Sequence, residues 1–243
     1  MRWKCGCSYD GTDYFGWQTQ EGQMSAQQMI EETLEGIFKS RVPIQGSGRT
    51  DTGVHAEEQV FHFDFDWEHG GEKMKKAIYS RLPKDIRVNY VEEVSDDFHS
   101  RFSAKAKRYR YQLFMGTADP FAWRYCWSVP ERVNLNTMKE AMSLLVGEHD
   151  FAALAANRGV DYESTVRTIT HAAIELENGY VNLSFQADGF MYKMVRTLAG
   201  TLVNVGLGRI GVEDVQNFLD TKKRTAMAFV APARGLFLER VFY

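Results

Sequence analysis

The sequence has no long apolar run and few cysteines, and each absence argues against a class of protein. No stretch of eighteen consecutive apolar residues occurs, and no basic-then-apolar segment opens the chain. We therefore expect neither a membrane span nor a signal peptide. The three cysteines are Cys5, Cys7 and Cys126. The first two lie two residues apart on one expected strand, a spacing that neither bridges nor chelates well. Buried, reduced thiols in a cytoplasmic protein are expected.

An excess of basic residues is also missing, since the formal net charge is −3. Proteins that bind nucleic acid indiscriminately usually carry such an excess, so the charge argues mildly against that class. A local basic groove remains compatible with this net charge. Hydrophobic residues make up 44% of the chain, which is enough for a folded core.

Three histidines recur every seven residues, at His55, His62 and His69. The second falls on an expected strand and the third in a polar turn. A metal centre requires ligands that converge, and this spacing does not supply convergence, so no metal site is expected.

Apolar periodicity predicts strands and helices along the whole chain. Strands are expected at 2–9, 59–65, 86–94, 104–115, 166–176, 180–187 and 236–242, and helices at 26–38, 72–82, 134–146, 190–205 and 212–220. Ser25 should cap the first helix, and Glu177-Asn178-Gly179 should form a hairpin turn. The small, polar stretch 152–165 is expected to be a mobile surface loop. A polar connection at 96–103 divides the chain into an N-terminal half, 1–105, and a C-terminal half, 106–243, each with an α+β pattern.

One stretch is rich in glycine and nearly free of apolar residues: Gly46-Ser47-Gly48-Arg49-Thr50-Asp51-Thr52-Gly53-Val54-His55-Ala56. Such a loop between two strands lets the backbone approach another group closely and take positive φ values. Two interpretations stay open from these residues alone. The loop is either a tight hairpin with a solvated aspartate, as turn composition favours, or a site that presents Asp51. The aromatic segment at 14–17 is interpreted as a core plug, with a stacking surface as the alternative.

A basic, aromatic strand follows the polar connection. Five cations and no acid lie between Arg101 and Arg110. On a strand, Lys107, Tyr109 and Tyr111 share one face, and Arg108, Arg110 and Gln112 share the other. One interpretation is a surface that grips RNA, with charge for phosphates and rings for bases. The other is a solvated strand at a sheet edge.

Arg196 is predicted to lie on the third long helix among small and apolar neighbours, Tyr192, Ala199, Gly200 and Val203. A cation in such surroundings is expected to be partly buried and to need a carboxylate partner. A surface arginine whose charged end reaches water is the alternative.

Seven segments, in order along nearly the whole chain, make the sequence similar to the tRNA pseudouridine synthase A (TruA) family. They are Tyr-Asp-Gly-Thr-Asp-Tyr-Phe-Gly-Trp-Gln (9–18), the glycine-rich stretch 46–56, Asp-Asp-Phe-His-Ser-Arg-Phe-Ser-Ala (96–104), Lys-Arg-Tyr-Arg-Tyr (107–111), Thr-Val-Arg-Thr-Ile (165–169), Gly-Phe-Met-Tyr-Lys-Met-Val-Arg (189–196) and Ala-Pro-Ala-Arg-Gly-Leu (231–236). The resemblance implies an α+β fold of two similar halves. Each half is a mostly antiparallel sheet backed by helices, and the halves join into one extended central sheet with a catalytic cleft.

The resemblance implies an isomerase that converts uridine to pseudouridine in tRNA. Asp51 would be the covalent nucleophile, attacking either the sugar or the base, and Arg196 would be its ion-pair partner. Tyr109 would stack on the target base, Arg49 would hold phosphate or the flipped nucleotide, and Leu236 would form an apolar wall. The expected RNA-binding cations along the cleft are Arg101, Lys105, Lys107, Arg108 and Arg110.

The resemblance also implies the substrate and the assembly. The expected substrate is the anticodon stem-loop of tRNA, modified at positions 38, 39 and 40 with the base flipped out. A homodimer is expected, and no cofactor, because substrate and product are isomers. The helix segment reads Met-Tyr-Lys before Met-Val-Arg, where many relatives carry histidines, so local RNA contacts are expected to differ. The stretches 64–72 and 152–163 carry no interpretable motif. The alternative function is a non-catalytic RNA-binding module with a sheet platform.

Overall fold

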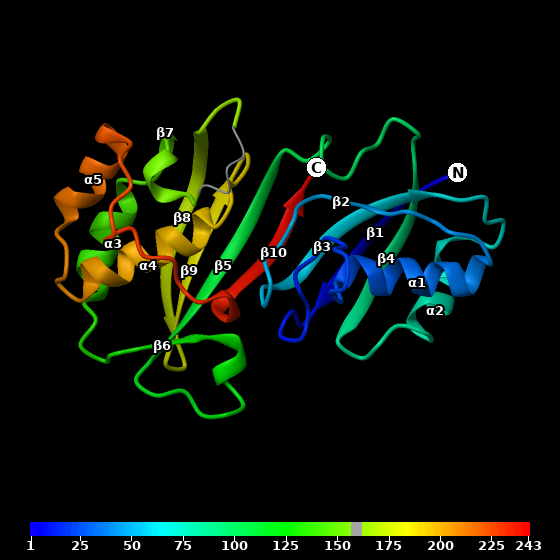
Figure 1. The fold of residues 1–243 in the computed structure, drawn as a ribbon, viewed down its shortest axis with the longest axis horizontal. Helices are drawn as coiled ribbons and strands as arrows, with labels where there is room; N and C mark the ends of the chain where they lie inside the picture. Colours follow the sequence, from blue (N-terminus) through cyan, green and yellow to red (C-terminus); the bar gives the residue numbers. More distant parts are fainter. Residues whose placement is uncertain (157–161) are drawn as a thin grey trace. The chain divides into compact units, whose positions relative to one another are not determined.

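The computed structural model describes residues 1–156 and 162–243. The chain folds as two compact units, Met1–Lys105 with Phe237–Tyr243, and Ala106–Leu236. The predicted second half, 106–243, differs from the second unit at its end. Its last strand pairs with a strand of the first unit, with Phe237 opposite His55 (Figure 1).

The first unit is a sheet with two helices. Its elements are β1 (Arg2–Tyr9), α1 (Ala26–Phe38), β2 (Gln45–Gly46), β3 (His55–Asp64), α2 (Gly71–Tyr79), β4 (Ile86–Val94) and β10 (Leu236–Phe242). The strands follow the order β4-β1-β3-β10, and β2 pairs with β3. Pairing is antiparallel throughout except between β3 and β10.

The side chains of the first sheet divide between its two faces because successive residues of a strand point opposite ways. Phe63 of β3 packs toward Phe38 of α1, with ring centroids 6.2 Å apart. Ser25 caps α1 as predicted, since its side chain accepts the N–H of Gln28. His62 points to the other face, where it meets Ser100 of the polar connection. One face is therefore covered by helix and the other, at this point, by the 96–103 segment.

In its described residues, the second unit is a second sheet with three α-helices. Its strands are β5 (Ala106–Met115), β6 (Trp127–Val129), β7 (Gly147–Asp150), β8 (Val166–Glu177) and β9 (Tyr180–Ala187), and its helices are α3 (Leu135–Ser143), α4 (Met194–Gly206) and α5 (Val212–Thr221). It also contains the 3₁₀ turns η1 (Trp123–Tyr125), η2 (Ala152–Leu154) and η3 (Ala233–Gly235). The strand order is β5-β9-β8-β7, all antiparallel, and β6 pairs parallel with β5. The predicted α+β class with mostly antiparallel strands is confirmed.

Two predictions about the second unit can be compared closely with the structure. The hairpin turn is confirmed, because Asn178 and Gly179 both take positive φ values, 50° and 82°, between β8 and β9. The long helix predicted at 190–205 starts later, at Met194. Lys193 has a φ of 54°, a left-handed conformation that cannot continue a helix. Of the stretch predicted as a surface loop, 157–161 lies outside the described residues.

The remaining sequence expectations concern single residues and spans. Cys5, Cys7 and Cys126 are free and buried, and burial raises the pKa of each thiol. In the predicted core plug, Tyr14 and Trp17 are buried, while Phe15 is exposed. No helix in the described parts of the chain is long and apolar enough to cross a membrane.

Candidate active site

The glycine-rich loop runs from β2 to β3 and presents one carboxylate. Asp51 is partly buried, between an exposed Arg49 and a buried Thr50 on one side and Thr52 on the other. Its carbonyl accepts the N–H of Val54 at 3.1 Å, which closes a turn. The loop is therefore an ordered turn with its carboxylate at the start.

The aromatic segment at 9–18 holds the loop on both sides of Asp51. Before it, the carbonyl of Thr50 accepts the N–H of Trp17 at 3.2 Å, and the Thr50 hydroxyl lies 2.8 Å from the phenol oxygen of Tyr9. After it, the N–H of Gly53 donates to the carbonyl of Tyr14 at 3.2 Å. Two sequence segments that the family resemblance matched separately thus form one substructure.

Glycine is required where these two segments touch. A Cβ on Gly16 would lie 2.3 Å from the carbonyl oxygen of Thr50 and 3.0 Å from the carbonyl carbon of Asp51, and the φ of Gly16 is +83°. A Cβ on Gly46 would lie 2.3 Å from the indole nitrogen of Trp17. Any larger residue would push the loop away from its support.

A buried amide holds the first half of the loop. Gln59 of β3 is fully buried and donates from Nε2 to the carbonyl of Gly48 at 2.8 Å. Its Oε1 accepts the hydroxyl of Ser47 at 2.8 Å. Sequence analysis missed this residue. The available signal was an amide directly before the apolar pair Val60-Phe61, where a buried polar group has to find partners.

In the second unit, Arg196 lies in the first turn of α4 and is partly buried. Its Nε donates to the carbonyl of Ala231 at 2.8 Å, and its own carbonyl accepts the N–H of Ala231 at 3.0 Å. Tyr111 lies close by and donates to the carbonyl of Pro232 at 2.7 Å. Burial raises the pKa of Tyr111, and the guanidinium of Arg196 acts in the opposite direction. Arg196 thus fixes the backbone at Ala231, and Tyr111 fixes it at Pro232. The pairing of Arg196 with Asp51 stays a prediction.

Two other predicted site residues of the second unit are buried. Tyr109 on β5 is 7% exposed and meets the ring of Phe190 edge-on, with centroids 5.1 Å apart. Leu236, the last residue of this unit, is 6% exposed. Their predicted roles, stacking on the base and walling the pocket, are not tested by these contacts.

On the basic strand two cations, Arg108 and Arg110, lie on the face opposite the tyrosine rings, while Lys107 shares the face of the rings. Arg108 donates from Nε and Nη2 to Oε1 of Gln186, at 3.1 and 2.8 Å. Arg110 contacts Gln112 and Asn182. Tyr109 and Tyr111 point to the opposite, buried face. A platform with exposed rings and cations mixed on one face is therefore not what β5 forms.

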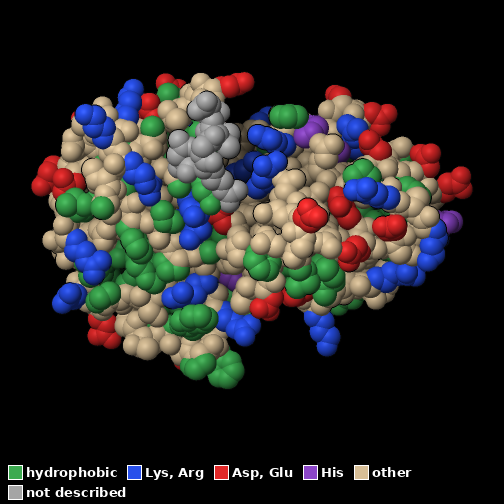
Figure 2. All heavy atoms as spheres, in the orientation of Figure 1, with side chains coloured by type: hydrophobic (Ala, Val, Ile, Leu, Met, Phe, Trp, Pro, Cys, Tyr) green, Lys and Arg blue, Asp and Glu red, His purple; other side chains and the backbone are tan. Residues whose placement is uncertain are grey.

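The other predicted cations differ in exposure. Arg101 and Lys105 are exposed in the first unit, and Lys107 is partly buried on β5. On the face that Figure 2 shows, basic and acidic side chains both occur in many separate places. Neither sign of charge therefore covers this whole face, in keeping with the small net charge of −3.

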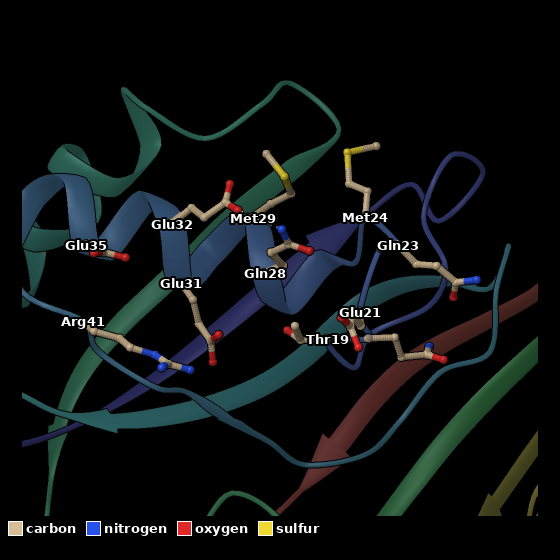
Figure 3. Close-up of a pocket in the computed structure, with 12 residues that line it drawn as sticks. Thr19, Glu21, Gln23, Met24, Gln28, Met29, Glu31, Glu32, Glu35 and Arg41 are labelled. Atoms are coloured by element: carbon tan, nitrogen blue, oxygen red, sulfur yellow. Dashed lines mark hydrogen bonds between the residues drawn. The ribbon is translucent and has the colours of Figure 1, made fainter.

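An open pocket in the first unit lies between α1 and the 19–24 loop (Figure 3). Its lining includes Glu21, Glu31, Glu32 and Glu35 against a single cation, Arg41. Carboxylates repel phosphate, so this pocket does not suit RNA. It contains none of the predicted site residues.

The three evenly spaced histidines make separate contacts. His55 accepts the N–H of Gly11 at its Nδ1, His62 lies 2.9 Å from the hydroxyl of Ser100, and His69 meets the ring of Trp67 edge-on. Among the residues that the structure describes, no three His, Cys, Asp or Glu side chains gather as a metal site.

Comparison with known proteins decides the family. The family described as tRNA pseudouridine synthase matches residues 7–103 and 141–243 of the chain. The chain belongs to this family. Its members are isomerases, which sets aside the alternative of a non-catalytic RNA-binding module.

Individual tRNA pseudouridine synthases match over almost their whole length. The tRNA pseudouridine synthase A of Thermoanaerobacter sp. (strain X514) is 40% identical over 236 residues, which cover 97% of this chain and 96% of the relative. That of Geobacillus kaustophilus (strain HTA426) is 40% identical over 245 residues, covering 100% and 95%. The resemblance seen in the seven sequence motifs is thereby confirmed.

Solved structures show a weaker likeness. A chain of a Cbf5–Nop10–Gar1 complex has a TM-score of 0.38 at 10% identity, and the match covers 83% of this chain and 44% of that one. A chain of an H/ACA RNP bound to a substrate RNA containing 2′-deoxyuridine also has a TM-score of 0.38, at 11% identity, covering 96% and 59%. These likenesses carry no argument about the site.

Proposed function

We propose that this tRNA pseudouridine synthase modifies uridines 38, 39 and 40 of the anticodon stem-loop and that Asp51 is its nucleophile. The observation that carries the proposal is the support of the Asp51 loop. Buried groups hold the backbone immediately before and after the carboxylate, at Thr50 and Gly53. A nucleophile gains most from such support, because a fixed carboxylate loses little entropy when it attacks.

The reaction breaks the bond between N1 of uracil and C1′ of ribose and forms a bond between C5 and C1′. The proton on C5 leaves and N1 gains a proton, so substrate and product have the same atoms. Asp51 attacks either C1′ or the base, and the carboxylate leaves again when the new bond is complete. No oxidant or cofactor is needed for this balance.

The other predicted residues act on binding and on the position of the carboxylate. Arg196, as ion-pair partner of Asp51, would hold the carboxylate in place. Tyr109 would stack on the uracil after it has flipped out of the stem, a step that costs about a few kcal/mol. Leu236 would line the pocket. Arg49 would hold phosphate or the flipped nucleotide.

The cations Arg101, Lys105, Lys107, Arg108 and Arg110 would follow the RNA backbone. We also propose a homodimer, in which a second subunit extends this basic track along the tRNA. A reducing, cytoplasmic location fits three free, buried thiols.

Pseudouridine mapping of unmodified tRNA transcripts tests the proposal. The wild-type protein should produce pseudouridine at positions 38, 39 and 40, and the Asp51→Asn variant at none of them. Pseudouridine formed only outside the anticodon arm would contradict the proposed substrate. Full activity of Asp51→Asn would contradict the proposed nucleophile.

A further inference from the structure

The segment 96–104 carries an aromatic ring that projects into solvent. Phe102 is 76% exposed, although rings of this size usually bury much of their surface. A single exposed apolar side chain is ordinary on a protein surface. What distinguishes Phe102 is how firmly its backbone is held and which side chains flank its ring.

His99 fixes the backbone at the tip of this segment. Its Nδ1 accepts the N–H groups of Arg101 and Phe102, at 3.1 and 3.3 Å. An imidazole nitrogen that accepts carries no proton, so the proton lies on Nε2 and donates to Oε1 of Gln45 at 2.8 Å. Ser103 closes the turn, because its hydroxyl accepts the N–H of His99 at 3.0 Å.

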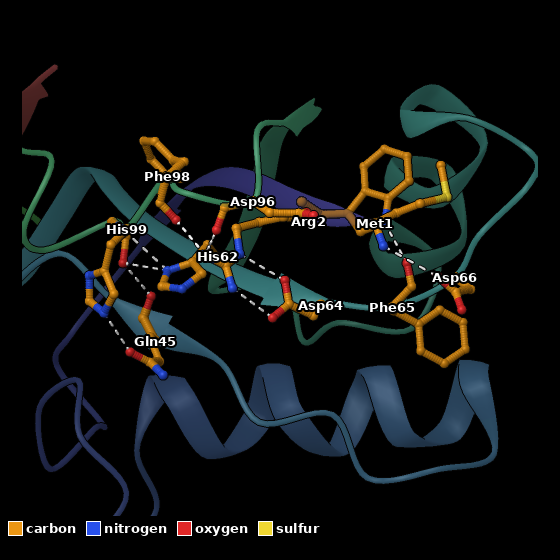
Figure 4. Close-up of polar contacts among 12 residues, drawn as sticks. Met1, Arg2, Gln45, His62, Asp64, Phe65, Asp66, Asp96, Phe98 and His99 are labelled. Atoms are coloured by element: carbon orange, nitrogen blue, oxygen red, sulfur yellow. Dashed lines mark hydrogen bonds and ion pairs between the residues drawn. The ribbon is translucent and has the colours of Figure 1, made fainter.

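The start of the segment is held by the first sheet, as Figure 4 shows for the labelled residues. Arg2 of β1 binds Asp64 with two 2.8 Å contacts and also donates to the carbonyls of Asp96 and Phe98. Ser100 is fully buried.

The middle of the segment is held from two further elements. The Ser100 hydroxyl donates to the carbonyl of Gln45 at 2.7 Å, and the carbonyl of Ser100 accepts the phenol of Tyr243 at 2.7 Å. The ring of Phe102 is thus presented by a preorganised turn, which lowers the entropy lost on binding a partner.

Groups that suit RNA flank the ring. The guanidinium carbon of Arg101 lies 5.6 Å from the centroid of the Phe102 ring, and the imidazole of His99 lies 4.3 Å from it, centroid to centroid. Asp96 and Asp97 stand at the far end of the segment in sequence. An exposed ring beside a cation is the pairing that proteins use to bind unpaired nucleotides, with the ring under a base and the cation near a phosphate.

The turn is also joined to the Asp51 loop. Gln45, which receives hydrogen bonds from His99 and Ser100, belongs to β2, and the chain runs directly from β2 into the glycine-rich loop. We propose that Phe102 stacks on an unpaired base of the tRNA substrate and that Arg101 contacts the adjoining phosphate. This inference rests on the proposed function, since it assigns a further contact to the RNA that Asp51 modifies.

Binding of an unmodified tRNA transcript tests the proposal, with Asp51→Ala as the background so that no turnover interferes. Phe102→Ala should weaken binding about tenfold, Phe102→Leu nearly as much, and Phe102→Trp little or not at all, because stacking needs a ring. Tyr79→Ala is the control: Tyr79 of α2 lies in the same unit and is 62% exposed. Its loss should leave binding unchanged.

A second measurement covers the case that a variant folds poorly. Wild-type protein bound to tRNA containing 5-iodouridine should crosslink on irradiation at the peptide that contains Phe102. The proposal would be overturned if Phe102→Ala bound tRNA as tightly as the wild-type protein. It would also be overturned if Phe102→Leu and Phe102→Trp bound equally tightly and no crosslink formed. A change of oligomeric state in Phe102→Ala with unchanged tRNA affinity would also overturn it and assign the ring to a protein contact instead. Failure of the proposed function would look different, because the wild-type protein would then form no pseudouridine in the anticodon arm.

Discussion

The first unit holds two loops in place by different means. The Asp51 loop is held by backbone that approaches backbone at glycine, as at Gly16 and Thr50, and by a buried side chain, Gln59. The turn that carries Phe102 is held by side chains, chiefly Arg2 and His99. The first arrangement leaves almost no room for movement and suits a reacting group. The second presents a ring to solvent and suits a contact with a partner. Substitutions in the Asp51 loop should therefore affect turnover, and substitutions in the Phe102 turn should affect RNA binding.

The largest effect should come from Gly16→Ala. The added Cβ would meet the carbonyl of Thr50 at 2.3 Å, in a backbone with a φ of +83°. We expect a loss of about 3 kcal/mol in the free energy of unfolding, measured by urea denaturation. Turnover should fall about a hundredfold, because the carboxylate is displaced.

Gly22→Ala is the matched control, since Gly22 also has a positive φ, +71°, but nothing within 4 Å of a Cβ. It should lower the free energy of unfolding by only about 1 kcal/mol, because only the backbone conformation is strained, and turnover should be unchanged. Equal losses in both variants would mean that close approach at Gly16 is not what supports the loop.

Gln59→Leu should have the next largest effect. It removes the partners of the Ser47 hydroxyl and the Gly48 carbonyl, and Gln59 is fully buried. The free energy of unfolding should fall by about 2 kcal/mol, and turnover should fall more than tRNA affinity does. Gln28→Leu, on the surface of α1, should change stability by no more than about 0.5 kcal/mol. A Gln59→Leu variant that lost tRNA affinity and kept its turnover would contradict the different roles assigned to the two loops.

Acid should loosen the turn that carries Phe102. Burial, with the nearby His99 and Arg2, lowers the pKa of His62 from 6.5 to about 4 in the folded protein. The unfolded state therefore binds a proton more readily, and stability present above pH 6.5 is lost as the pH falls toward 4. Between about pH 7 and about pH 5 this contribution is about 2 kcal/mol. Denaturation at the two pH values should show it, and His62→Gln should reduce it.

The exposed His69 supplies the control for this pH effect. His69→Gln should keep the dependence on pH that His62 provides, because the His69 ring lies against Trp67 and not in this turn. An identical dependence in His62→Gln and in the wild-type protein would show that His62 does not couple this turn to pH.

Much of the fold could be predicted because apolar periodicity records burial. The α1 helix and the strands β1, β4 and β9 lie where the pattern of apolar residues predicts them. The start of α4 could not be predicted, because Lys193 adopts a left-handed conformation that its residue type does not indicate. The parallel pairing of the last strand with β3 joins residues far apart in sequence, which local patterns do not reveal.

The candidate site was predictable to a smaller degree. The loop that presents Asp51 stood out by its glycines and its lack of apolar residues. The groups that support this loop did not stand out. Trp17 and Thr50 are joined by a backbone hydrogen bond, which side-chain identity does not reveal. Phe102 gave no signal either, since one ring in a polar segment has no periodicity, and only its exposure distinguishes it.

The smallest effect concerns charge. Despite the net charge of −3, tRNA binding should weaken steeply as salt rises, because Lys and Arg contacts to phosphates release counterions. Arg101→Ala should lower the slope of log K against log salt by about one. Lys73→Ala, on the exposed side of α2, should leave the slope unchanged. A flat salt response of the wild-type protein would contradict the predicted basic track.

The central claim is that Asp51 performs the chemistry and that other residues hold the RNA. The most direct test measures tritium release from C5-labelled uridine in tRNA, together with tRNA affinity, for Asp51→Ala and the wild-type protein. The account predicts no release by the variant and an affinity within about twofold of the wild-type value. Tritium release by Asp51→Ala at a rate near that of the wild-type protein would contradict it.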